Sequence, residues 1–223
     1  TGLAVLGSSH GGRQIPIYME AAGLLEPGFM THEMHPGILH YLIHSYDDPV
    51  HAPLGERMAE RYAVVAPDAG HAQHMVSHIF HALADWEASE AANVNAAGVV
   101  NEQRRAQGRP ETSCGHYNEW LVYAQLQQGK DASRLVTECV AQVAALAADV
   151  PADAEGKATE VPGAWSATRV AIFHGVDGGA WPDWIAMPAT SENGSARFQQ
   201  AHGQVLQWWS GDRMALEGQA RAA

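Results

Sequence analysis

A pair of histidines recurs in this chain at a displacement of 34 residues. His40 and His44 are four residues apart, and His74 and His78 repeat that spacing. Residues four apart lie on one face of an α-helix, one turn from each other. A displacement of about 34 residues is typical of a repeat built from two helices and a turn. The sequence therefore predicts that equivalent helices of stacked repeats place the two pairs side by side.

Turn residues divide the chain into helix pairs. Pairs are expected over residues 36–65, 70–101 and 115–150, with turns at Asp47-Asp48-Pro49, Ala84-Asp85 and Gly129-Lys130-Asp131. Further pairs are expected over residues 1–28, around Gly11-Gly12, and in the C-terminal stretch, around Gly178-Gly179 and Gly211-Asp212. Apolar residues recur at helical spacing, and few stretches alternate as a strand would. We expect an all-α solenoid of about five to six antiparallel helix hairpins, forming one domain over residues 1–223.

The composition excludes some partners and favours a cation. The formal net charge is −12, so no basic surface is expected to replace the counterions of a nucleic acid. No apolar run is long enough to cross a membrane. The 13 histidines equal Lys and Arg together, and neutral imidazole is a common metal ligand. Cys114 and Cys139 are expected at different heights of a helix hairpin, so a disulfide between them is not expected.

Aligning the turns of the second and third helix pairs extends the histidine pattern. In that register His71 matches His116, His74 matches Glu119, and His78 matches Tyr123. The candidate metal ligands are therefore His35, His40, His44, His71, His74, His78, His116 and Glu119. His35 precedes its helix and is either a ligand or an N-terminal cap. Asp47 and His81 lie about one turn beyond the paired histidines, where each can hydrogen bond to an imidazole and fix its tautomer.

Nitrogen-rich ligation favours zinc first and copper next, and disfavours calcium and magnesium. The candidates outnumber the ligands of one tetrahedral ion. Either two ions bind, or some histidines act as hydrogen-bond partners or proton carriers. A histidine network without metal, or a pH switch, is the alternative.

Residues 36–97 resemble the tetratricopeptide-repeat proteins. Ala84-Asp85-Trp86-Glu87-Ala88 corresponds to the turn of that repeat, and Pro67 to its terminal proline. His35-Pro-Gly, His40-Tyr-Leu-Ile-His44 and His71-Ala-Gln-His74-Met-Val-Ser-His78 are similar to a family of bacterial tetratricopeptide-repeat proteins, with Val76 where that family has proline. The resemblance implies an α-solenoid with a concave groove and supplies no reaction. It also implies that the chain is the C-terminal part of a longer bacterial protein, for which a periplasmic or secreted location fits.

Three functions follow as hypotheses. The first is a metal-binding interaction scaffold with a histidine-rich site on its concave face, where a peptide or small molecule is bound. The alternative is a zinc- or copper-dependent hydrolase or oxidase at the same site, with Glu119 as general base and Tyr123 stabilising an oxyanion. A metal-storage or sensing protein is a third possibility. The HExxH signature of metalloproteases does not occur.

Overall fold

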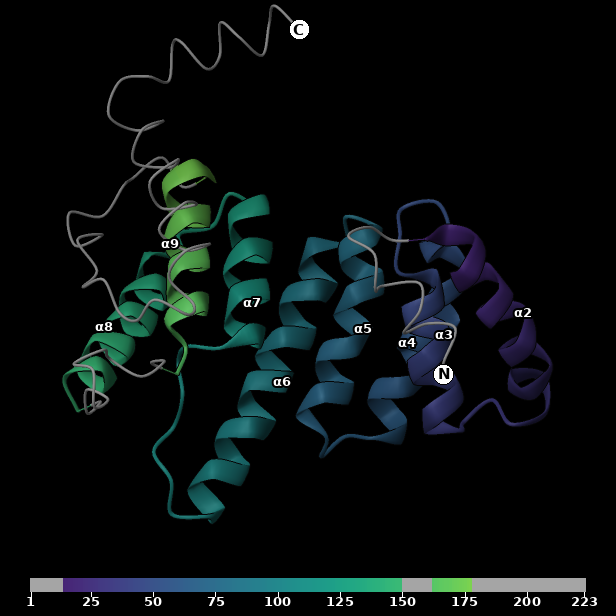
Figure 1. Cartoon of the computed structure of the whole chain (residues 1–223), viewed down its shortest axis with the longest axis horizontal. Coiled ribbons are helices and arrows are strands. Elements are labelled where there is room, and N and C mark those ends of the chain that lie inside the picture. Colours follow the sequence, from purple (N-terminus) through teal and green to yellow (C-terminus); the bar gives the residue numbers. More distant parts are fainter. Residues whose placement is uncertain (1–13, 150–161, 178–223) are drawn as a thin grey trace, which may run out of the picture. The chain divides into compact units, whose positions relative to one another are not determined.

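The computed structural model describes residues 14–149 and 162–177, and all regular secondary structure in those ranges is helical (Figure 1). The predicted all-α class is therefore confirmed for the described part of the chain. Two compact units divide the chain: residues 1–111 with 127–130, and residues 112–126 with 131–223. The expectation of a single repeat domain stays a prediction. The predicted turns at Gly11-Gly12, Gly178-Gly179 and Gly211-Asp212 lie outside the described residues.

The first unit contains five described helices, which follow one another along the chain (Figure 1). They are α2 (Ile15–Thr31), α3 (Pro36–Tyr46), α4 (Ala52–Val65), α5 (Gly70–Ala82) and α6 (Trp86–Ala106). Each packs against the next, and α3 also contacts α5. The predicted pairs over 36–65 and 70–101 match these bounds, except that α6 continues to Ala106. Contact between α3 and α5 brings together the helices that carry the two histidine pairs.

Local signals explain where these helices begin. Pro36 occupies the first turn of α3, and His35 caps it by accepting a hydrogen bond from the Ile38 amide through Nδ1, at 3.3 Å. Asp85 caps α6 in the same way, since its carboxylate accepts from the Ala88 amide at 3.0 Å. Ala84, just before this cap, has a φ of 58° and forms the predicted turn.

A close-packed apolar core fixes α3, α4 and α5 against one another. Six large side chains in it are almost fully inaccessible to solvent: Leu39, Leu42, Ile43, Met58, Met75 and Ile79. Each such side chain contributes about 1.5–3 kcal/mol through burial. At Gly55 of α4 a β-carbon would lie 2.5 Å from the Ile79 side chain, so the absence of a side chain there allows the close approach.

The second unit contains α7 (His116–Gln127, apart from its last residue), α8 (Ser133–Asp149) and α9 (Ala164–Asp177) among its described residues. All three helices contribute to its core, with Val122, Val136 and Val170 among the buried residues. No described helix in either unit combines the length and apolarity required to cross a bilayer.

The expectation about the cysteines was wrong. Cys114 and Cys139 form a disulfide, with their Cα atoms 4.3 Å apart. The hairpin argument assumed that Cys114 lies at the height of its own helix end. Instead the segment before α7 runs back along α8, where the Ser113 amide donates to the Gln142 side chain at 2.9 Å. That fold-back places Cys114 beside the middle of α8.

Candidate metal centre

Five of the predicted ligands lie together in the first unit. His40 and His44 come from α3, and His71, His74 and His78 come from α5. Across the two helices, the His44 and His78 ring centroids are 6.0 Å apart and those of His40 and His71 are 5.2 Å apart. The predicted side-by-side placement of the two histidine pairs is thus confirmed.

The tautomer of His74 is set by Asn93 of α6. The Asn93 amide nitrogen donates to the Ser89 carbonyl at 2.8 Å, which turns Oδ1 toward His74 Nδ1, 2.7 Å away. Because that oxygen can only accept, Nδ1 of His74 carries the hydrogen. Both residues are fully buried. In its neutral form His74 therefore presents a bare lone pair on Nε2.

The tautomer of His78 is set in the same sense by Asp47, which follows α3. His78 Nδ1 lies 2.8 Å from Asp47 Oδ2. The carboxylate accepts, so Nδ1 donates and Nε2 is again the nitrogen without a hydrogen in the neutral ring. The hydrogen bond predicted for Asp47 is confirmed. A carboxylate–histidine pair of this kind commonly orients an imidazole toward a metal.

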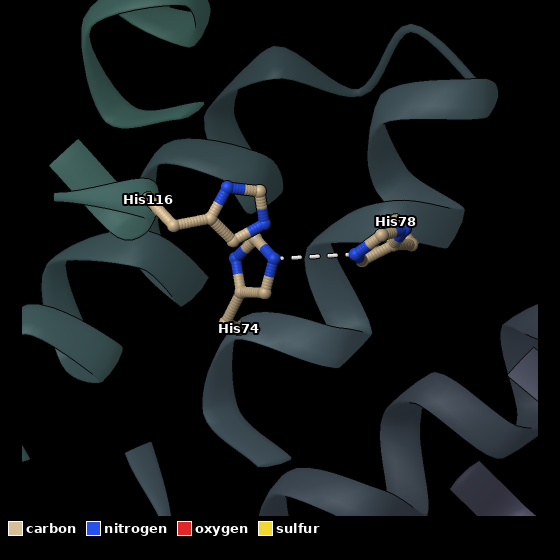
Figure 2. A group of neighbouring side chains, drawn as sticks. All are labelled: His74, His78 and His116. Atoms are coloured by element: carbon tan, nitrogen blue, oxygen red, sulfur yellow. Dashed lines mark hydrogen bonds between the residues drawn. The ribbon is translucent and has the colours of Figure 1, made fainter. Parts of the chain in front are cut away.

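The Nε2 atoms of His74 and His78, which carry no hydrogen in these tautomers, face each other. Figure 2 shows the His74 and His78 rings on α5, and their Nε2 atoms are 3.2 Å apart. Two lone pairs at this distance repel unless a cation lies between or beside them, either a proton or a metal ion. Two imidazole nitrogens on one tetrahedral zinc ion, each at 2.0–2.1 Å, are about 3.4 Å apart. The observed Nε2–Nε2 distance of 3.2 Å is close to that value.

No protein-family model, curated protein or solved structure matches this chain.

The remaining rings surround this pair. His40 Nδ1 is 3.1 Å from the Tyr62 hydroxyl of α4, which leaves Nε2 of His40 for another partner. His44 is half-buried beside His40, with ring centroids 4.8 Å apart. His71 is exposed and lies at the outer side of the cluster. His71 is thus the exposed member of the cluster, while His74 is its fully buried member.

Burial keeps the surrounding imidazoles neutral. It lowers the pKa of His40 and of His71, and the neighbouring imidazoles lower both further. Burial, then the nearby His40 and His78, lower the pKa of His44 to about 4, against the raising effect of Asp47. These rings therefore offer lone pairs at neutral pH, which is the state that binds a metal.

Two predicted residues of the first unit have other partners. His35 is exposed and uses Nδ1 to cap α3, which agrees with the cap interpretation. His81 Nδ1 lies 3.3 Å from the Ser89 hydroxyl, and its ring packs edge-on against Trp86. Burial lowers the pKa of His81 to about 4. His81 thus lines the junction of α5 and α6.

The predicted residues of α7 belong to the second unit. His116 is exposed and its ring packs against Trp120. Glu119 is 2% exposed, and its Oε1 accepts a hydrogen bond from the Ser166 hydroxyl at 2.5 Å. Its Oε2 lies 2.7 Å from Arg169 Nη1, an ion pair without an aligned hydrogen bond. Burial raises the pKa of Glu119. The second predicted catalytic residue, Tyr123, packs against Phe173.

Asn93 and Tyr62 were not predicted as part of the site. A signal for Asn93 existed, because Ser89 and Asn93 interrupt an alanine-rich helix at positions one turn apart. Buried amides need hydrogen-bond partners, so this pair pointed to a polar group on a neighbouring helix. For Tyr62 the apolar stripe of α4 gave only a packing interpretation.

Proposed function

We propose that this chain is a metal-binding helical-repeat protein of the tetratricopeptide type, in which His74 and His78 bind a transition-metal ion and the solenoid serves as an interaction scaffold. One observation carries the proposal: two imidazole nitrogens, each without a hydrogen in the neutral tautomer, face each other at 3.2 Å. Their other nitrogens are held by Asn93 and Asp47. Such partners fix the orientation of metal-bound histidines and raise their basicity.

A metal ion explains this arrangement better than a shared proton. Protonation of one ring would place an imidazolium beside His74, which is 0% exposed. Burying a charged group is costly even when a carboxylate lies nearby. A metal ion instead uses both lone pairs at once, at the separation that tetrahedral coordination requires. Zinc is the first choice because nitrogen ligands suit it, and copper is the second.

Further ligands can come from two sources. His44 and His71 are not counted among them, because their ring centroids, 6.0 Å from His78 and 6.4 Å from His74, respectively, lie farther away than the roughly 5.1 Å expected for two imidazoles on one zinc ion. His116 stays a ligand predicted from the repeat register. A peptide or small molecule bound in a concave groove of the solenoid can supply another through an open coordination position. In that case the protein acts as a scaffold that binds the peptide or small molecule only when the metal is present.

The metalloenzyme alternative has less support among the described residues. Its predicted general base, Glu119, is buried and engaged by Ser166 and Arg169 within the second unit. A carboxylate with two such partners resembles a structural ion pair more than a base that waits for substrate. We therefore favour binding over catalysis.

The test is metal analysis of the untagged full chain. After purification and dialysis against buffered zinc, wild-type protein should retain zinc, and both His74→Ala and His78→Ala should lose the ion at this pair. His32→Ala is the matched control, because His32 is exposed and, among the described contacts, its side chain hydrogen bonds only to Thr31. If the ion is structural, His74→Ala should also lower the melting temperature more in the presence of zinc than in its absence. Wild-type protein that retains no metal refutes the proposal.

His116 is tested in the same assay. If it is a ligand of this ion, His116→Ala weakens zinc binding at least tenfold, since one of a small number of coordinate bonds is lost. Unchanged affinity removes His116 from the ligand set and leaves the rest of the proposal in place.

A further inference from the structure

The five imidazoles of the first unit form a closed circuit of ring contacts. Around the circuit the centroid separations are 4.8 Å for His40–His44, 5.2 Å for His40–His71, 6.4 Å for His71–His74, 4.9 Å for His74–His78 and 6.0 Å for His44–His78. Three of these separations are short and two are long. The two long ones cut the circuit into a group of two rings and a group of three.

The short and long ring separations can be compared with the separation of two imidazoles bound to one metal ion. Two imidazoles bound through nitrogen to one tetrahedral zinc ion at about 2.05 Å have centroids about 5.1 Å apart. The short separations, 4.8–5.2 Å, match that value on both sides of the division. The long separations, 6.0 and 6.4 Å, exceed it by about 1 Å. By this measure each group of rings matches one shared ion more closely than all five rings do.

We propose that His40, His44 and His71 form a second site for a divalent transition-metal ion, next to the one at His74 and His78. His40 is the central ligand, because it lies at coordination spacing from both other rings. The inference rests on the proposed function, since it assumes that the histidine cluster binds metal. It goes beyond that function by giving the cluster a stoichiometry of two.

Among the described residues, His40, His44 and His71 are not already arranged as a complete set of metal ligands, so the rings must turn on binding. Rotation about the Cβ–Cγ bond, which is soft in histidine, redirects the ring nitrogens without moving the backbone. His40 can keep its contact with the Tyr62 hydroxyl through Nδ1 while it binds through Nε2.

The experiment is native mass spectrometry of the untagged full chain at a buffered free-zinc concentration. Wild-type protein should reach two zinc ions per chain, His71→Ala one, His78→Ala one, and the double variant none. His32→Ala should keep two. Because His71 is exposed, its truncation should leave the apo melting temperature unchanged, so a lost ion reports a lost ligand.

Each outcome decides a different question. If wild-type protein binds one ion and His71→Ala keeps it, the second site does not exist and the proposed function stands. If wild-type protein binds one ion and both single variants lose it, the two groups of rings share one ion, which also overturns the second site. If wild-type protein binds no zinc, the proposed function itself fails.

Discussion

Asp47 gives the sharpest prediction, because among the described contacts its side chain hydrogen bonds to one proposed ligand, His78. Its carboxylate accepts from His78 Nδ1 at 2.8 Å and is not itself a proposed ligand. Loss of such a partner weakens metal binding by about 10–100-fold. That range corresponds to about 1.4–2.8 kcal/mol of binding free energy. Asp47→Asn retains an acceptor oxygen and removes only the charge, so we expect about tenfold weaker zinc binding. Asp47→Ala removes both, so we expect about 100-fold.

The assay is a competition titration with a chromophoric zinc chelator at pH 7.5. Asp68→Asn controls for the change in net charge, because Asp68 is exposed in the turn between α4 and α5. Its zinc affinity should equal that of the wild type. Equal affinity in Asp47→Ala and wild type would refute the reasoning, since His78 would then not depend on Asp47 to present Nε2.

Three further predictions concern stability. Reduction of the Cys114–Cys139 disulfide should destabilise the second unit by about 3 kcal/mol, because it releases a loop of 25 residues and so raises the conformational entropy of the unfolded chain. A urea transition with the same midpoint with and without reductant would contradict this prediction. Metal-free protein should lose stability as the pH falls from 6.5 to about 4, because His44 and His81 take up protons near 6.5 when unfolded and only near 4 when folded. Urea transitions at pH 7.5, 6 and 5 measure this change, and a rise in stability on acidification would contradict the prediction. Asn93→Ala should lower the free energy of unfolding of the metal-free protein by about 2 kcal/mol, since the buried His74 Nδ1–H loses its acceptor. A thermal unfolding curve that matches the wild type would show that this hydrogen bond is not formed.

The sequence was sufficient to predict which helices carry the site. Spacing of four residues puts His40 with His44, and His74 with His78, on single faces, and the 34-residue displacement puts those faces on neighbouring helices. Turn residues located α3 to α6 closely, because proline and acidic caps act locally. Only the end of α6 was missed, where Arg104 and Arg105 extend the helix past the predicted boundary.

Ring orientation could not be predicted in the same way. The helical face fixes where an imidazole lies, but the hydrogen bond to its other nitrogen fixes which nitrogen is free. For His74 that partner is Asn93, on a different helix, and no periodicity in the sequence connects the two. The disulfide was missed for a related reason, since the segment before α7 has no periodic pattern that would show its path along α8.

The most direct test of the central claim is an X-ray anomalous difference map of zinc-loaded crystals, recorded on both sides of the zinc absorption edge. Our account predicts a peak within about 2.1 Å of both Nε2 atoms of His74 and His78. It would be contradicted by an empty position there with the two nitrogens still about 3 Å apart, because the pair would then share a proton.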